Sequence, residues 1–454
     1  MLLDQGFNQR NFRRIYDAEN RKGANLEERF CLVSEEFAEL KQQTITIKNL
    51  KIELKDSISH QRVERTEETA DAVNIAATAL REAADGKERY LNDHLEDLAN
   101  SIARDGHNLT LTPHAIPGGK TLFLSNNDPA TFFIEKQIQH NISRLYKISP
   151  GNKDVIVPQV MSFCGGKFPF WGLRTDISDF YETIDHRKLL KLLKSDQLLD
   201  APSIRYIQQV LFAYSHATGS AVGLPRGNGI SAYLAELFMR PIDTAVKSLG
   251  DVLYYARYVD DIFILCAQSP EWKTVDRLAD ITASVQSHGL ALNPTKTIEF
   301  SNTDPTKARF NYLGYEFKIA NGQCEVDISA EKRNRYRNRI NKCFDIYMRA
   351  PARKKHNAGE TLLRRIIYLT SNTKLHNNKS NAYIGVYYSN RHVNKPARFK
   401  DLDAALNYKI SLVGNLRLQA RLMRCSFELG YGEQRFTYFK QAELINIVRI
   451  WKYE

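Results

Sequence analysis

The stretch from residue 254 to residue 265 constrains the fold of this chain more than any other. Its sequence, YYARYVDDIFIL, has apolar and aromatic residues on both sides of two adjacent aspartates, Asp260 and Asp261. Such residues favour strands, so the stretch predicts a hairpin with both carboxylates at its turn. Carboxylates beside an apolar run are costly unless a cation neutralises them, and Mg²⁺ prefers oxygen ligands of this kind. A surface hairpin with an acidic tip has the same pattern, so this motif alone assigns no function.

The composition limits the class of protein. A chain of 454 residues is too long for one ordinary core, so several subdomains are expected. Its 64 Lys and Arg against 52 Asp and Glu give a net charge of +12, which suits a polyanionic partner. The six cysteines show no C-x-x-C spacing, which predicts neither a zinc site nor a disulfide framework. Residues 1–14 hold no signal-peptide core and no apolar run is long enough to span a bilayer, so we expect a soluble cytoplasmic protein without a membrane partner.

The first part of the chain, residues 1–110, has the periodicity of amphipathic helices. Leu26, Phe30, Phe37 and Leu40 recur at helical spacing, and a second periodic stretch over residues 63–102 predicts another long helix, interrupted at Gly86. Residues 107–130 are rich in Pro and Gly, which predicts loops and a subdomain boundary. This region carries no chemical motif.

Two motifs precede the acidic hairpin. Asp176 stands at the end of a short predicted strand, with an aromatic residue, Tyr181, five positions later and a helix predicted over residues 187–199. Residues 223–231 then form a loop with three glycines that contains Pro225, Arg226 and Gly227 and leads into a helix. Loops of this kind can hold a phosphate close to the backbone, although most of them are structural.

Two motifs and a basic stretch follow the hairpin. Residues 291–297 predict a turn that presents Lys296, and residues 310–317 predict a compact hairpin. Between residues 332 and 355, ten Lys or Arg residues face only one acidic residue, with aromatic residues between them. A helix with this pattern suits a phosphate backbone better than a merely solvated face. The residues at its start are Lys332, Arg333, Arg335, Arg337, Arg339 and Lys342. Residues 371–400 predict a loop with one short strand, and residues 406–454 a helical tail.

Taken in order, these motifs resemble motifs A to E of a reverse transcriptase palm, over about residues 140–320. The resemblance implies an α+β right-hand polymerase with palm, fingers and thumb. It implies a helical N-terminal extension over residues 1–110, fingers and palm over 111–325, a basic helical thumb over 326–400 and a helical C-terminal region over 401–454. The implied activity is RNA-templated DNA synthesis by two-metal nucleotidyl transfer, with two Mg²⁺ ions, for which Mn²⁺ is a possible substitute.

The resemblance also implies a role for each site residue. Asp176 and Asp260 bridge both metals, Asp261 is the companion carboxylate, and the backbone carbonyl of Ile177 completes one metal's sphere. Lys296 approaches the triphosphate as a proton donor. Tyr181 is the steric gate against a 2′-hydroxyl, and Val259 also favours deoxynucleotides. The remaining implied residues are Pro225, Arg226 and Gly227 at the nucleotide, Arg144 and Lys147 as finger residues at the triphosphate, and Leu313, Gly314 and Tyr315 as the primer grip.

One departure narrows the resemblance. Retroviral, retron and group II intron enzymes usually carry Gln after the proline of the glycine-rich loop, where this chain has Arg226. Together with residues 180–184 and 384–388, this is similar to bacterial abortive-infection and defence-associated reverse transcriptases. Residues 11–23 most resemble the first polymerase of a type-3 defence-associated system. The implied partners are a companion noncoding RNA template, the DNA product, dNTPs, and a second reverse transcriptase subunit or another copy of the chain.

Three alternatives stay open at this point. The first is template-independent or protein-primed DNA synthesis, for which Tyr383, Tyr387, Tyr388 and Tyr453 offer hydroxyl groups. The second is an enzyme of the retron or intron type, which Arg226 disfavours. The third is an inactive nucleic-acid-binding scaffold, which has no reason to keep three carboxylates.

Overall fold

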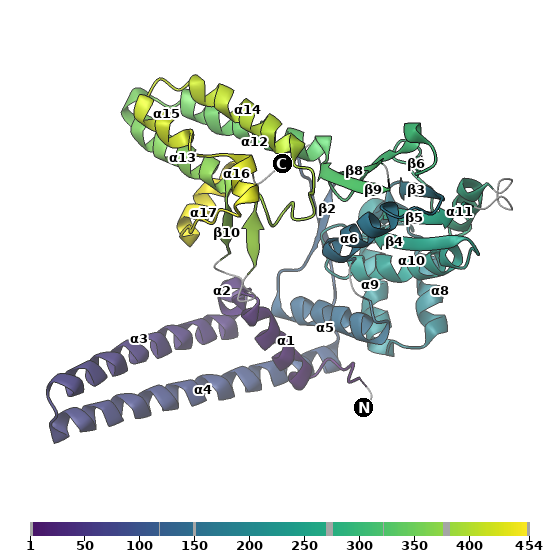
Figure 1. Ribbon diagram of the computed structural model, residues 1–454. Coiled ribbons are helices and arrows are strands. Elements are labelled where there is room, and N and C mark those ends of the chain that lie inside the picture. Colours follow the sequence, from purple (N-terminus) through teal and green to yellow (C-terminus); the bar gives the residue numbers. More distant parts are fainter. Residues whose placement is uncertain are drawn as a thin grey trace. The chain divides into compact units, whose positions relative to one another are not determined.

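The computed structural model describes residues 3–117, 119–148, 151–268, 276–320, 322–375 and 382–451. Helices and antiparallel sheets alternate along the chain, which confirms the α+β class (Figure 1). The chain divides into two compact units, of which the first contains Met1–Ser149 and Asp179–Pro241 and the second Pro150–Ser178 and Ile242–Glu454. The division into four domains stays a prediction.

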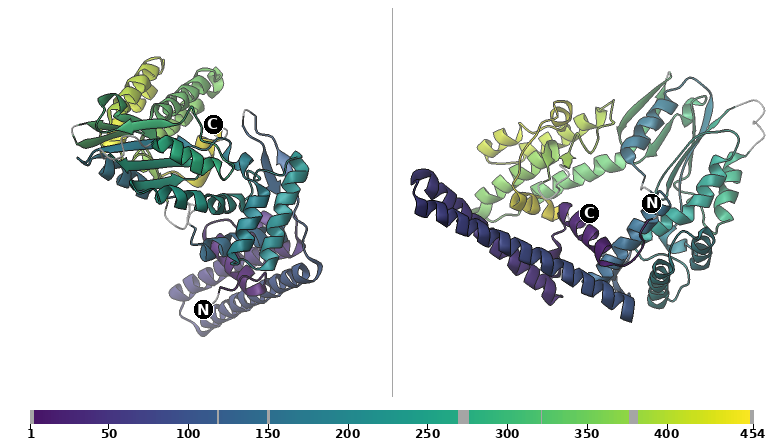
Figure 2. Two further views of the ribbon diagram at one scale, coloured as in Figure 1. Left: turned by 90° about the vertical axis from the view of Figure 1, so that its right-hand side faces the viewer. Right: turned by 90° about the horizontal axis from the view of Figure 1, so that it is seen from below.

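The N-terminal part of the first unit is helical, as predicted, with α1 (Gln9–Arg21), α2 (Leu26–Phe30), α3 (Glu35–Val63) and α4 (Glu67–Asp105). The side chains of Ser34 and Thr66 cap the starts of α3 and α4. The two long helices run side by side as a hairpin in all views (Figures 1 and 2). The predicted interruption at Gly86 is wrong, because α4 continues through this residue: packing against α3 outweighs the helix penalty of a single glycine, about 1 kcal/mol.

The rest of the first unit surrounds the glycine-rich loop. A two-stranded antiparallel sheet is formed by β1 (Leu111–His114) and β2 (Leu122–Ser125), and α5 (Pro129–Leu145) packs against α1 through Phe12 and Phe133. The remaining helices are α7 (Phe180–Thr183), α8 (His186–Asp196), α9 (Ala201–Thr218) and α10 (Ser231–Lys247), the last of which continues into the second unit. The predicted helix over residues 187–199 is therefore confirmed as α8, although it ends earlier.

A four-stranded antiparallel sheet lies at the centre of the second unit. Its strands are β3 (Phe170–Asp176), β4 (Val252–Tyr258), β5 (Asp261–Ala267) and β6 (Ile298–Ser301), in the order β4-β5-β3-β6. The predicted strand before Asp176 and the predicted acidic hairpin are thus confirmed as β3 and β4–β5. Helix α6 (Lys153–Cys164) packs against β4, and α11 (Arg277–Gln286) follows β5 along the chain.

A second antiparallel sheet shares the aromatic core of this unit. It contains β7 (Arg309–Tyr312), β8 (Tyr315–Ala320) and β9 (Gln323–Ile328), and confirms the predicted hairpin over residues 310–317. A short 3₁₀ turn, η2 (Pro305–Lys307), precedes it. The rings of Phe300 and Phe310 stack with centroids 4.0 Å apart, and Phe263 lies beside both. This packing fixes the two sheets against each other.

The C-terminal part of the second unit is mostly helical. Helices α12 (Ala330–Met348), α13 (Lys355–Thr370) and α14 (Ala397–Ser411) pack together (Figure 1), and Ile340, Ile366 and Leu402 are buried among them. A two-stranded sheet of β10 (Asn372–Lys374) and β11 (Tyr383–Gly385) lies between helices in the sequence. The remaining elements are η3 (Ala352–Lys354), α15 (Leu416–Leu422), α16 (Phe427–Gly432), α17 (Gln441–Val448) and η4 (Arg449–Trp451). Tyr453 lies outside the described residues.

Candidate active site

The three predicted catalytic aspartates come to one end of the central sheet. Asp176 is the last residue of β3 and pairs directly with Asp261, the first residue of β5. The backbone N–H of Ile177 donates to the carbonyl of Asp260, with the two atoms 3.2 Å apart. The antiparallel register therefore places carboxylates from distant parts of the sequence beside each other.

The turn that carries Asp260 has a strained backbone held by an arginine. Val259 has φ 60, a left-handed conformation that is rare for a β-branched residue. Arg257 donates to the Val259 carbonyl over 2.8 Å and makes two further hydrogen bonds, each 2.9 Å long, to the carboxylate of Asp243. Since the Arg257 side chain is only 7 % exposed, this buried ion pair fixes the shape of the turn.

Two cations pair with Asp176 and Asp261, two of the three aspartates. The Lys296 ammonium donates to Oδ2 of Asp176 over 2.8 Å, and Nε of Arg174 lies 2.9 Å from Oδ1 of Asp261. Burial nevertheless raises the pKa of Asp261 to about 6; Arg174 opposes this shift, and the charges of Asp176 and Asp260 add to it. The site is therefore a concentrated negative charge that favours cations.

The turn that presents Lys296 is tied to the end of β3. The N–H of Asn293 donates to the carbonyl of Asp176 over 2.7 Å, and the N–H of Ser178 donates to the carbonyl of Ala291 over 2.8 Å. The guanidinium of Arg174 donates to the carbonyl of Lys296 over 3.0 Å. These bonds keep the ammonium group of Lys296 beside the aspartates.

The donor set suits a hard divalent cation. Among the residues that the structure describes, no three His, Cys, Asp or Glu side chains are grouped closely enough to hold a metal ion by themselves. Mg²⁺ needs no such group, because it binds through one or two carboxylates together with substrate phosphates. Asp176 and Asp261, paired across β3 and β5, provide the carboxylate oxygens that such binding requires.

The predicted steric gate belongs to the first unit, where it contacts the glycine-rich loop. The guanidinium of Arg226 lies over the ring of Tyr181, 4.9 Å from its centroid, and forms two hydrogen bonds of 2.7 and 3.0 Å with the carboxylate of Glu182. The N–H of Leu224 donates to the carbonyl of Tyr181 over 2.6 Å. Gly227 has φ 95, a conformation that suits glycine in this tight loop.

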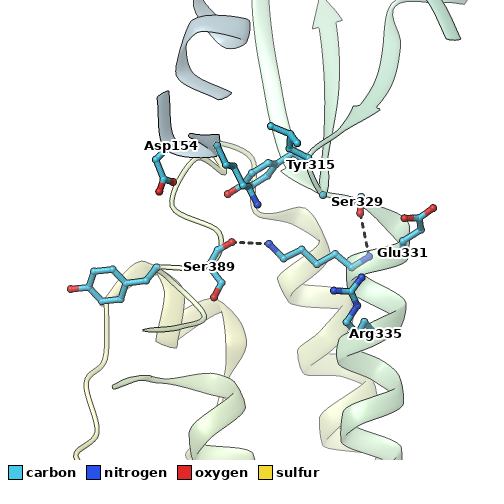
Figure 3. A pocket seen from close by; sticks show the side chains of 11 residues that line it. Asp154, Tyr315, Ser329, Glu331, Arg335 and Ser389 are labelled. Atoms are coloured by element: carbon cyan, nitrogen blue, oxygen red, sulfur yellow. Dashed lines mark hydrogen bonds between the residues drawn. The ribbon is translucent and has the colours of Figure 1, made fainter. Parts of the chain in front are cut away.

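A pocket of about 550 Å³ joins the predicted primer grip to the start of the basic helix α12 (Figure 3). Leu313 and Gly314, both with positive φ, make the tight turn between β7 and β8 that presents Tyr315. The ammonium groups of Lys153 and Lys332 lie 4.4 and 5.1 Å from the centroid of the Tyr315 ring. Burial lowers the pKa of Lys332 to about 7, and the charges of Lys153 and Arg335 shift it the same way. The pocket is lined by three basic residues, Lys153, Lys332 and Arg335, and by two acidic ones, Asp154 and Glu331.

Some basic residues of α12 contact other parts of the second unit, and others are exposed or line the pocket. Arg333 pairs with Asp401, Arg339 lies over the ring of Trp451, and Lys332 donates to the Ser389 carbonyl. Arg335 is exposed and lines the pocket, whereas Arg337 and Lys342 lie further along the helix. The predicted finger residues, Arg144 near the end of α5 and Lys147 just beyond it, are both exposed in the first unit.

Several residues of the site were not identified from the sequence. Arg174 lies two positions before Asp176 on β3, so strand alternation, which puts both on one face, was a usable signal. Asp243 and Arg257 carry no motif, and only the packing of α10 near β4 pairs them. Glu182 follows Tyr181 directly, but its partner is in a distant loop.

The comparison with known protein families agrees with this geometry. Residues 158–317, which include the three aspartates and Tyr315, match the family described as "Reverse transcriptase (RNA-dependent DNA polymerase)". Among curated proteins, no sequence matches this chain significantly. In the described segments, no helix is long and apolar enough to cross a membrane.

Several solved structures are similar to the chain. One is apo telomerase from Candida tropicalis, with a TM-score of 0.38 and 10 % identity over 78 % of this chain and 64 % of that chain. Another is the same telomerase truncated from its C-terminal domain, with a TM-score of 0.36 and 11 % identity over 52 % of this chain and 60 % of that chain. Telomerase from Candida albicans in complex with the TWJ fragment of telomeric RNA has a TM-score of 0.35 and 11 % identity over 85 % of this chain and 73 % of that chain.

The chain thus spans 60 % and 64 % of the length of the first two structures, and at these TM-scores the likeness carries no argument about function. What remains is the family match, which covers β3, the acidic hairpin and the turn of Lys296. Residues 158–317 match the model of the reverse transcriptase family, so this part of the chain is similar to the domain of an RNA-directed DNA polymerase.

Proposed function

We propose that the whole chain is an RNA-templated DNA polymerase that copies a companion noncoding RNA in bacterial antiphage defence. The observation that carries the polymerase activity is the pairing of Asp176 with Asp261 beside Asp260, at one end of a sheet within the reverse transcriptase domain. Nucleotidyl transfer needs bound cations, and the cluster of carboxylates at this end of the sheet supplies the negative charge that attracts them.

In this proposal Asp176, Asp260 and Asp261 hold two Mg²⁺ ions, and the carbonyl of Ile177 adds a ligand. When bound, the ions lower the pKa of the primer 3′-hydroxyl and stabilise the leaving pyrophosphate. Lys296, held beside Asp176, donates a proton to pyrophosphate, and Arg174 holds Asp261 in place. Arg144 and Lys147 neutralise the triphosphate, and Tyr181 excludes a 2′-hydroxyl.

The pocket at Tyr315 supports contact with a nucleic-acid strand. Lys153 and Lys332 lie over an aromatic ring, and Arg335 lines the same pocket, a combination that suits phosphate and base contacts. We assign Leu313, Gly314 and Tyr315 to the primer strand. We assign the exposed basic residues of α12 to its phosphates.

Sequencing of nucleic acid that copurifies with the protein tests both the activity and the template. Wild type is compared with a variant that carries Asp260→Asn and Asp261→Asn. We expect one discrete RNA in both preparations and complementary DNA in the wild type alone. DNA that matches no bound RNA, or DNA of equal amount in both, would refute templated synthesis at this site.

The defence role rests on the sequence alone, through Arg226 and residues 11–23. We expect protection of a bacterial host against phage infection by the wild-type gene together with its neighbouring noncoding RNA. The Asp260→Asn, Asp261→Asn variant should give none. Equal plaque counts with the wild type and an empty vector over a broad phage panel would contradict this role.

One structural observation favours protein-primed synthesis as a second candidate. Tyr388 lines the same pocket as Gly314 and Tyr315, and its ring stacks on that of Tyr383 with centroids 5.2 Å apart. A hydroxyl at this place offers a primer next to the predicted primer grip. DNA that stays with the protein through phenol extraction, is released by protease, and disappears in Tyr388→Phe would establish it. DNA released by heat alone would exclude it.

A further inference from the structure

Arg226 contacts two consecutive residues, Tyr181 and Glu182, of the segment 179–183, which we call the gate segment. Its Nε and a terminal nitrogen form a two-pronged pair with Glu182, and its guanidinium covers the ring of Tyr181. Paired hydrogen bonds of this kind between arginine and carboxylate are strong and directional. A single residue of the glycine-rich loop thus contacts two consecutive residues of α7.

The gate segment is fixed at further points. Lys120 lies 2.7 Å from the carboxylate of Asp179 and 3.0 Å from that of Glu182. The backbone N–H of Leu224 binds the carbonyl of Tyr181. Asp179, with φ 44, has an unfavourable backbone conformation that such contacts hold in place.

The carboxylate of Glu182 in this cluster stays charged at neutral pH. Burial alone would raise the pKa of Glu182, but hydrogen bonds from Arg226 and Lys120 outweigh burial and lower it to about 2. Glu182 therefore stays ionised at neutral pH. The Arg226 side chain, 31 % exposed, is partly shielded from solvent, which strengthens the pair.

From these contacts we infer that Arg226 is a positioning residue that holds the ring of Tyr181 in place and thereby sets the selectivity for deoxynucleotides over ribonucleotides. The inference rests on the proposed function and deepens it. Glutamine at this position could not hold the ring and Glu182 in the same way, because it has no positive charge.

The test measures kcat/KM for one dNTP and for the matching rNTP on an RNA template with an annealed primer. In Arg226→Gln we expect the dNTP-to-rNTP ratio to fall about tenfold, because the ring loses the cation and α7 loses the two-pronged pair. Arg226→Lys, which keeps the charge but not the fork, should give an intermediate ratio. Combined with Tyr181→Ala, Arg226→Gln should lower the ratio no further, since it acts through the ring.

The chain offers a matched control in the same unit. Arg240 lies over the ring of Tyr146, 5.1 Å from its centroid, and pairs with Asp196 over 3.2 Å. Arg240→Gln thus removes the same kind of contact from a different tyrosine. We expect it to leave the dNTP-to-rNTP ratio unchanged.

Each outcome is decisive. If Arg226→Gln lowers kcat/KM equally for both nucleotides, Arg226 acts on the triphosphate or on folding, and the inference is wrong. If the losses from Arg226→Gln and Tyr181→Ala multiply, Arg226 does not act through the ring, and the inference is also wrong. A wild-type enzyme that makes no DNA refutes the proposed function and the inference with it, whereas an active wild type with an unchanged ratio in Arg226→Gln refutes the inference alone.

Discussion

Replacement of Gly172 by alanine tests how tightly the sheet that carries Asp176 is packed. A Cβ at Gly172 would lie 2.3 Å from two ring carbons of Phe300, which is fully buried. The ring cannot move aside easily, because Phe310 stacks on it and Phe263 lies beside it. Added volume in a well-packed core costs about 1–3 kcal/mol, and the lower chain entropy of alanine offsets about 0.5–1 kcal/mol.

Because the approach of 2.3 Å is severe, the upper part of that cost applies, and the expected net loss of about 1–2.5 kcal/mol lowers the Tm of a unit of this size by roughly 2–10 °C. Thermal unfolding followed by circular dichroism measures it, with Gly250→Ala as the control, since no atom lies within 4 Å of a Cβ there. Phe300→Leu makes room, so the penalty of Gly172→Ala should shrink in that background. A Tm of Gly172→Ala equal to the wild type, or a penalty that Phe300→Leu does not change, would refute the reasoning.

The remaining predictions concern other parts of the chain. Gly86→Ala, at an open position inside α4, should stabilise the protein by about 0.5–1 kcal/mol in urea unfolding, and a lower midpoint would count against the continuous helix. Val259→Gly should relieve the left-handed strain and raise the free energy of unfolding, measured in urea, by about 1 kcal/mol, so an unchanged value would show that the turn stores no strain. The pKa of Glu182, about 2 in the folded chain, lies below its ordinary value of 4.5, so its contribution to stability is full above pH 4.5 and is lost as the pH falls toward 2. Discounted for solvent exposure, this contribution to the free energy of unfolding is about 1–2 kcal/mol. Glu182→Gln should remove it at pH 7. Equal stability of the variant and the wild type in urea at pH 7 would show that the ion pair of Glu182 with Arg226 does not stabilise the fold.

The sequence was sufficient where local patterns decide the structure. The apolar residues around Asp260 and Asp261 predict β4 and β5 because strand preference and burial act on neighbouring residues. The same holds for β3 before Asp176 and for the tight turn at Gly314, where positive φ favours glycine. The pairing of Asp176 with Asp261 is non-local and was accessible only through the order of the motifs.

Other features needed the tertiary structure. Whether Arg333 and Arg339 face solvent or pack against Asp401 and Trp451 depends on α14 and η4, so a count of charges could not decide it. The pair of Arg226 with Glu182 joins residues far apart in sequence. At Gly86 the weak local preference of glycine against a helix is outweighed by the packing of α4 along α3.

The most direct test of the central claim is primer extension on a defined RNA template with purified protein, dNTPs and Mg²⁺. Wild type is compared with Asp176→Asn and with Asp276→Asn, an exposed helix cap in the same unit where asparagine caps equally well. We expect template-directed DNA from the wild type and from Asp276→Asn, and none from Asp176→Asn. Full extension by Asp176→Asn would contradict it.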